Sequence, residues 1–132
     1  MNSAVKNNLA IIYKNGLNNE CPNLFFAKEY LSEAIKQDKN YLAFYNLANI
    51  IFDEEEKENK DHFESIDILA KFIFFFPSII LFCLILIKKY RFIDEAIIKS
   101  ELKKHNPQIA ELSSNFYQGW STLKKLINDV TF

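Results

Sequence analysis

The side chains that could carry out chemistry are few and widely spaced along the chain. There are two histidines, His62 and His105, and two cysteines, Cys21 and Cys83. Neither histidine belongs to a His-Glu-x-x-His motif and the cysteines do not form Cys-x-x-Cys, so the spacing of a zinc site is missing. The sequence also lacks a Gly-x-Ser-x-Gly turn, and two isolated glycines cannot build a phosphate-binding loop. We therefore predict that the chain is not an enzyme and needs no metal or cofactor. The alternative is an enzyme of unrecognised type, which a pocket lined by Cys21 or by either histidine with paired acids would indicate.

The cysteines and histidines are expected to have structural roles. The chain begins without the apolar core of a signal peptide, which predicts a cytoplasmic location and two free, buried thiols rather than a disulfide. Cys83 lies within an apolar run, where a thiol behaves as a small hydrophobic group. For His62 and His105 we expect a place at the surface or at a helix cap.

One run of charge stands out, DEEEKENKD at residues 53–61. Consecutive helical residues point in different directions, so its three successive glutamates cannot act as a catalytic pair. Two interpretations stay open for this run. It is either a solvated helix end with its loop, or an acidic patch that meets a basic partner.

Apolar residues at helical spacing predict seven helices. Six of them cover residues 3–15, 22–37, 40–56, 79–90, 93–104 and 107–127, and another follows Asp61 and includes Phe63 through Ile73. The hydrophobic stripe at residues 40–52 is too wide for a helix on a surface, so this helix should be packed on more than one side. The expected N-caps are Ser3, Asn40, Asp61 and Asn106, and the prolines Pro22 and Pro107 suit a first helical turn.

The sequence repeats itself with an offset of 38 residues. Asn8-Leu9-Ala10-x-Ile12 matches Asn46-Leu47-Ala48-x-Ile50, and further matches are Ala27 with Ser65, Leu31 with Leu69 and Phe25 with Phe63. A repeat of this length indicates an array of helix pairs. Small residues at Ala10, Ala27 and Ala48 would let paired helices approach closely.

These matched residues resemble tetratricopeptide repeats, and more closely the related Sel-like repeats. The first copy reads Leu9, Ala10, Tyr13, Asn15-Gly16, Ala27, Tyr30-Leu31 and Ala34, and the second reads Leu47, Ala48, Ile51, Ser65, Leu69 and Phe72, with Pro77 at the turn between repeats. The sequence departs from the family pattern in three ways. The glycine of the first helix is alanine in both copies, the second turn carries the acidic insert instead of glycine, and Phe72 replaces an alanine.

The resemblance implies an all-α fold, a right-handed α-α superhelix of about three antiparallel helix pairs with a C-terminal capping helix. The single domain 1–132 would contain repeats at about 3–39, 40–77 and 78–105, and a capping helix at about 107–128. A length of 132 residues suits one domain with an unassisted core, and the net charge of −1 argues against nucleic acid as a partner.

Residues 72–87, FIFFFPSIILFCLILI, carry no charge. A helix of this length falls short of the ~30 Å hydrocarbon layer, and Pro77-Ser78 divides the run at an expected turn. We predict two buried segments, and uncovered apolar surface there could form a homodimer face. The alternative is a membrane-anchored helical scaffold with residues 72–87 in the bilayer.

The function predicted from these features is protein–protein recognition. Stacked helix pairs present a concave face, whose free positions would be Asn7, Asn8, Ile11, Lys14, Tyr45, Asn46, Asn49 and Phe52. Asparagines beside aromatic rings suit recognition of a protein, although Asn8 and Asn46 could instead only brace the repeat turns. Small size, absent catalytic motifs and the acidic residues Asp53, Glu54, Glu55 and Glu56 suggest an immunity or inhibitor protein that blocks a basic toxin or effector.

Overall fold

The structure is a computed structural model that describes residues 1–17, 20–71, 73, 75–91, 94–108 and 114–131. These described residues form seven helices and contain no strand, which confirms the all-α prediction. The chain divides into two compact units, residues 1–59 and residues 60–132. We refer to them as unit 1 and unit 2 and describe each by itself. Their boundary falls inside the segment assigned to the second repeat, and the right-handed superhelix stays a prediction.

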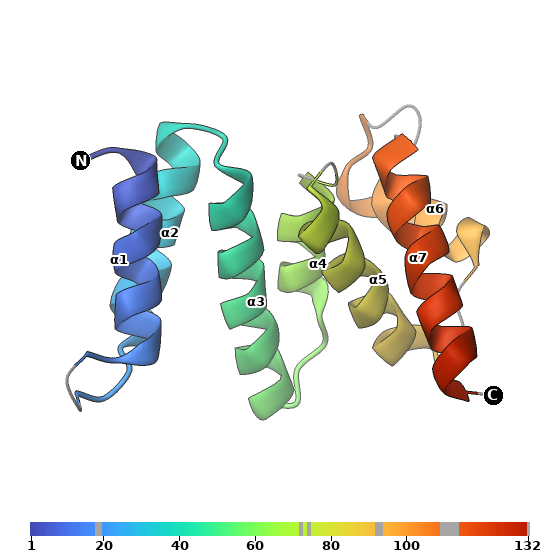
Figure 1. Ribbon diagram of the computed structural model, residues 1–132, viewed down its shortest axis with the longest axis horizontal. Helices are drawn as coiled ribbons and strands as arrows, with labels where there is room; N and C mark the ends of the chain where they lie inside the picture. Colours follow the sequence, from blue (N-terminus) through green and yellow to red (C-terminus); the bar gives the residue numbers. More distant parts are fainter. Residues whose placement is uncertain (18–19, 72, 74, 92–93, 109–113, 132) are drawn as a thin grey trace. The chain divides into compact units, whose positions relative to one another are not determined.

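Unit 1 consists of three helices, α1 (Ser3–Asn15), α2 (Leu24–Gln37) and α3 (Tyr41–Lys57). Figure 1 shows α1 and α2 as an antiparallel pair, and α2 also packs against α3. Small side chains make these close contacts possible, because they let the helix axes approach. Those with no exposed surface at all are Ala10, Ala27, Ala34, Ala43 and Ala48.

Asparagine side chains begin all three helices of unit 1. Asn2, Asn23 and Asn40 accept hydrogen bonds from the backbone N–H groups of the third residue after each, at 2.9, 3.1 and 3.1 Å. The cap predicted at Asn40 is confirmed. Ser3 is not the cap of α1, because Asn2 takes that position and the Ser3 hydroxyl donates to Asp38 at 2.6 Å.

The second helix also begins later than predicted. Pro22 lies outside α2, because the side chain of Asn23 can accept the N–H of Phe26 and the helix therefore starts at Leu24. Asparagine is among the best N-caps, whereas proline contributes only a fixed φ angle.

Unit 2 contains four helices, α4 (Phe63–Lys71), α5 (Phe76–Tyr90), α6 (Glu95–His105) and α7 (Ser114–Thr131). Helix α5 packs against both α4 and α7, and α6 packs against α4. Large apolar side chains with no exposed surface form the core, among them Ile66, Leu69, Ile79, Phe82, Leu86, Ile98 and Leu102. In α7 the apolar side chains of Phe116, Trp120 and Leu123 are buried.

The first residues of two helices in unit 2 differ from the prediction. Helix α5 starts at Phe76 rather than at residue 79, with Pro77 in its first turn. Helix α6 starts at Glu95 rather than at residue 93, because the side chain of Asp94 accepts the N–H of Ile97 at 2.9 Å.

Asn106 does not begin a helix, although Asn106-Pro107 predicts one. Its backbone N–H donates to the Leu102 carbonyl at 2.7 Å and so ends α6, while its side chain donates to the Ala70 carbonyl on α4 at 3.1 Å. The side-chain amide of Asn106, which could have served as an N-cap, therefore joins the end of α6 to α4. The structure describes the last helix, α7, from Ser114.

Several residues matched by the 38-residue offset have the same exposure, although Ile12 is 42% exposed whereas Ile50 is 1% exposed. Leu31 and Leu69 both have no exposed surface, and the same holds for Ala27 and Ser65 and for Ala10 and Ala48. The matched phenylalanines, Phe25 and Phe63, are both exposed, at 65% and 56%. The resemblance to a named repeat family stays a prediction.

The uncharged run 72–87 is largely core in its described part. Ile73, Ile79, Phe82, Cys83, Ile85 and Leu86 are buried, while Leu84 is exposed on α5. Of the helices formed by described residues, none combines the length and the apolar character that crossing a membrane requires. A homodimer face in this region stays a prediction.

Candidate functional site

The structure places the residues predicted for partner binding on α1 and α3, but it does not bring all of them to the surface. Asn7 is buried and accepts a hydrogen bond of 3.0 Å from the side chain of Asn46. Asn46 therefore braces α3 against α1, and Asn8 is exposed. The other predicted positions are partly exposed: Ile11, Lys14, Tyr45, Asn49 and Phe52.

The acidic residues at the end of α3 do not share one exposed face. Glu55 is buried, and Glu54 forms an ion pair of 3.0 Å with Lys28 of α2. Asp53 and Glu56 are exposed. Successive helical residues turn by about 100°, so a run of four samples all sides of the helix. The negative surface of this segment is therefore smaller than the sequence suggests.

A cluster of aromatic rings lies where α1 ends and α2 begins. The Tyr13 ring lies 5.5 Å from the Phe26 ring and stacks on Tyr30 at 5.7 Å, and the Phe25 and Phe26 rings are 5.7 Å apart. Such centroid distances are typical of attractive aromatic pairs. We call Tyr13, Phe25, Phe26 and Tyr30 the aromatic surface of unit 1.

This aromatic surface remains open to solvent. Phe25 is 65% exposed, Phe26 43% and Tyr13 37%. These aromatic residues were not among those predicted to bind a partner, although the sequence indicates that at least one of the phenylalanines is exposed. The buried stripe of α2 runs through Ala27, Leu31 and Ala34, and two adjacent phenylalanines just after the cap cannot both lie on that stripe.

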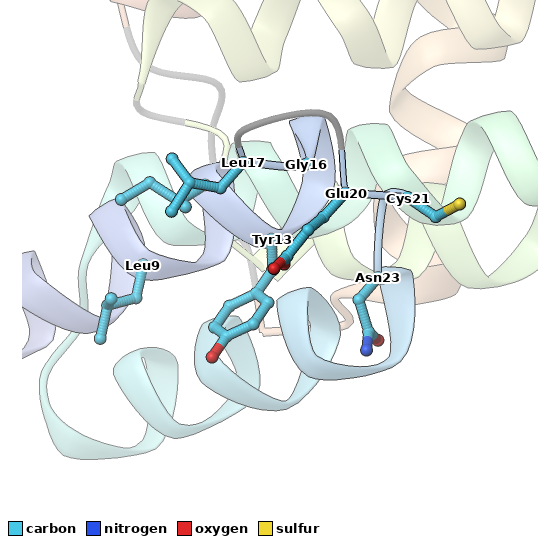
Figure 2. A pocket seen from close by; sticks show the side chains of 8 residues that line it. Leu9, Tyr13, Gly16, Leu17, Glu20, Cys21 and Asn23 are labelled. Carbon is cyan, nitrogen blue, oxygen red and sulfur yellow. The ribbon is translucent and has the colours of Figure 1, made fainter.

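A pocket of about 310 Å³ adjoins the aromatic surface (Figure 2). It lies where α1 passes into the loop before α2, and Tyr13 belongs both to the aromatic surface and to the pocket wall. Its lining residues are Leu9, Ile12, Tyr13, Gly16, Leu17, Glu20, Cys21 and Asn23.

Backbone hydrogen bonds hold the loop around this pocket. Glu20 donates its N–H to the Leu17 carbonyl at 2.9 Å, and Asn23 donates to the Tyr13 carbonyl at 2.7 Å. Gly16 has φ +78°, and a Cβ atom there would collide with the Glu20 carbonyl oxygen. Glycine is therefore required at this turn, and it lets the loop fold back against the end of α1.

The two cysteines differ in environment. Both are free, and Cys21 is exposed at the pocket whereas Cys83 is buried in α5. The expectation that both thiols are buried is thus wrong for Cys21, because the loop before Pro22 is at the surface. Burial raises the pKa of the Cys83 thiol to about 12, so this thiol stays protonated and unreactive near neutral pH.

Unit 2 contains a chain of polar side chains centred on His105. His105 Nδ1 lies 3.1 Å from Asp67 Oδ1, and His105 Nε2 lies 3.6 Å from Glu101 Oε2. The hydroxyl of Tyr90 donates to Glu101 Oε1, which Lys89 approaches at 3.5 Å. The imidazole is 1% exposed, so a surface or capping role for His105 is wrong.

These contacts shift the ionisation of the carboxylates. Burial raises the pKa of Glu101, but the Tyr90 hydrogen bond and the positive charge of Lys89 outweigh it and leave that pKa lowered. The same balance holds at Asp67, where burial is outweighed by hydrogen bonds from His105 and Lys71, and its pKa is lowered. The hydrogen bond to Glu101 raises the pKa of Tyr90.

The arrangement around His105 fits a structural role better than a reactive one. The two carboxylates approach opposite nitrogens of one ring, so their oxygens do not converge on a common point. The described part of the chain holds no group of three or more histidine, cysteine or acidic side chains suited to a metal ion. The polar chain joins α4, α5 and α6 instead.

Comparisons of the chain with protein-family models, with curated proteins and with solved structures find no match. The function is therefore inferred from the surfaces and pockets of the two units.

Proposed function

We propose that this chain is a non-enzymatic binding module that recognises a protein partner through the aromatic surface of unit 1. One observation carries the proposal: the four rings form a connected series of ring contacts at the junction of α1 and α2, and three of them, Tyr13, Phe25 and Phe26, are exposed. Contiguous exposed apolar surface is uncommon on isolated domains and marks interaction sites. Tyrosine and phenylalanine are enriched at interfaces because they cover a large area with few rotatable bonds.

The neighbouring side chains extend this surface. Ile12 is 42% and Leu17 53% exposed, and both also line the adjoining pocket. An apolar centre beside a concavity can hold a protruding side chain of a partner and exclude water around it.

The proposal is tested by replacing the two phenylalanines and measuring partner capture. Tagged wild-type protein and a Phe25→Ser, Phe26→Ser double variant are used to capture proteins from lysate of the source cells, which are identified by quantitative mass spectrometry. Leu42→Ser is the matched control, because Leu42 is 46% exposed on α3 of the same unit. A partner retained by wild type and Leu42→Ser but lost from the double variant supports the proposal. Equal capture by all three proteins contradicts it.

A narrower version is that the partner is a toxin or effector that this chain blocks. Residues 1–59 contain nine acidic and six basic side chains, a formal net charge of −3. A negative unit favours capture of a basic protein by long-range attraction.

The structure selects the residues for testing this version. Asp53→Lys and Glu56→Lys change the charge of exposed side chains. Glu54 forms an ion pair with Lys28, and Glu55 is buried, so neither is replaced. The double replacement should slow association with a basic partner and reduce its salt dependence. An unchanged association rate would remove the acidic segment from the binding mechanism.

A further inference from the structure

We infer that the pocket at the end of α1 binds a lysine or arginine side chain of the protein partner. The inference rests on the proposed function, because it assigns the chemistry of one contact within the same surface. The pocket volume of about 310 Å³ is at the small end of the range of ligand sites, which suits a single side chain.

The walls of the pocket match the two halves of a long basic side chain. Leu9, Ile12 and Leu17 supply apolar surface, against which the methylene stem of lysine or arginine packs. Glu20 and Tyr13 lie in the same wall and suit the charged head. A carboxylate forms a charge-assisted hydrogen bond with an ammonium or guanidinium group, and the face of a tyrosine ring attracts the same cation.

The carboxylate also determines which occupants are disfavoured. Glu20 is exposed and lines the pocket, so an apolar side chain placed over its carboxylate would remove water from a charge without replacing it. An acidic occupant would be repelled by Glu20 and by the net charge of −3 of residues 1–59. A cation with an aliphatic stem satisfies both halves of the pocket.

Backbone contacts fix the chain at Gly16 and Glu20. The Glu20 N–H donates to the Leu17 carbonyl, and Gly16 allows the Glu20 carbonyl oxygen to approach closely. A backbone that is already held at these positions loses less conformational freedom on binding.

The test uses small probes, so it does not depend on the identity of the partner. N-acetyl-lysine methylamide and N-acetyl-arginine methylamide are titrated into the full-length ¹⁵N-labelled protein, and the amide signals of Gly16, Glu20 and Cys21 are followed by NMR. N-acetyl-norleucine methylamide has the lysine stem without the charge and is the matched probe. We expect saturable shifts with millimolar Kd for the two basic probes and weaker binding of the norleucine probe.

Two variants test whether the Glu20 carboxylate contacts the basic probe. Glu20→Gln should weaken the lysine probe by up to about fivefold, the upper end of what exposed ion pairs contribute. Glu29→Gln, an exposed glutamate on α2, is the control and should leave all probes unchanged. Equal binding of the norleucine and lysine probes, or unchanged lysine binding to Glu20→Gln, overturns the inference.

Failure here is distinguishable from failure of the proposed function. If the basic probes do not bind while the Phe25→Ser, Phe26→Ser variant still loses its partner, only the assignment of the pocket is wrong.

Discussion

The side-chain amide of Asn46 on α3 donates a hydrogen bond of 3.0 Å to the side-chain oxygen of Asn7 on α1. The two residues are far apart in the sequence, and Asn7 is 3% exposed. This bond therefore links the first and third helices of unit 1 beneath the surface, and it uses two residues that the sequence pattern assigned to partner recognition.

Replacing Asn46 by alanine should destabilise unit 1. The oxygen of Asn7 would remain buried without its partner, and an unsatisfied buried acceptor costs about 1–3 kcal/mol. The measurement is urea unfolding followed by circular dichroism. Asn8→Ala is the control, because Asn8 is exposed and surface substitutions usually stay within about 0.5 kcal/mol. Equal midpoints for the two variants would mean that the bond does not hold the helices together.

The periodic pattern of the sequence predicted more of the fold than of the functional surface. Seven helices follow from apolar spacing, and the bounds of α1 agree with the structure. Helix starts were less predictable. Asn2 and Ser3 compete for the N-cap of α1, and Asn23 caps α2 after Pro22, which was predicted to lie in the first turn of that helix. The cap is decided by which side chain reaches the free N–H groups.

Contacts between residues that are far apart in the sequence could not be predicted from local sequence patterns. Asn106 has the sequence context of an N-cap, yet its amide is used by the Ala70 carbonyl on another helix. The burial of His105 depends on Asp67 and Glu101, and only the fold shows that these surround it. The aromatic surface forms because the end of α1 meets the start of α2, which places Tyr13 beside Phe26.

The stability of unit 2 should fall in acid because of Glu101 and Asp67. Both carboxyl pKa values are lowered in the folded chain, so between the folded and unfolded values the unfolded chain binds more protons. Their contribution is complete above the pKa values of the unfolded chain, about 4, and is lost as the pH falls through the lowered pKa values of the folded chain. Thermal unfolding between pH 7 and pH 3 measures this loss.

A Glu101→Gln variant separates this effect from general acid unfolding. At pH 7 the variant should be less stable by about 1.5–3 kcal/mol, the range for hydrogen bonds to a charged group. As the pH falls through the lowered pKa of Glu101, the wild-type carboxyl becomes protonated and the difference should shrink. A constant difference across this pH range would show that the charge of Glu101 does not contribute.

Gly16→Ala should destabilise unit 1 and distort the pocket. The φ of +78° favours glycine, and the added Cβ would collide with the backbone of Glu20. Backbone strain of this kind costs of order 1–3 kcal/mol. Chemical unfolding measures the loss, and the NMR signals of Leu17 and Glu20 should move even where the helices remain intact. A variant as stable as wild type, with unchanged loop signals, would contradict this role of Gly16.

The opposite effect is expected at the end of α5. Arg91 has φ 63° and ψ −24°, and its N–H donates to the Ile87 carbonyl at 2.7 Å to close the helix. A left-handed conformation costs about 1–2 kcal/mol for a residue with a Cβ atom but almost nothing for glycine. Arg91→Gly should therefore stabilise unit 2, by less than this amount because glycine also gains freedom in the unfolded chain. A lower melting temperature than wild type would contradict this expectation.

The two cysteines should differ sharply in their reaction with iodoacetamide. Cys21 is exposed, whereas Cys83 has no exposed surface and its thiol pKa is raised to about 12 by burial. Because the thiolate is the nucleophile, native protein near neutral pH should gain one adduct and denatured protein two, as counted by intact mass spectrometry. Cys21→Ser should gain no rapid adduct in the native state. Slow modification of Cys83 in this variant would then report opening of the unit 2 core, at a rate that rises when that core is destabilised. Two rapid adducts on native wild-type protein would show that α5 does not bury Cys83.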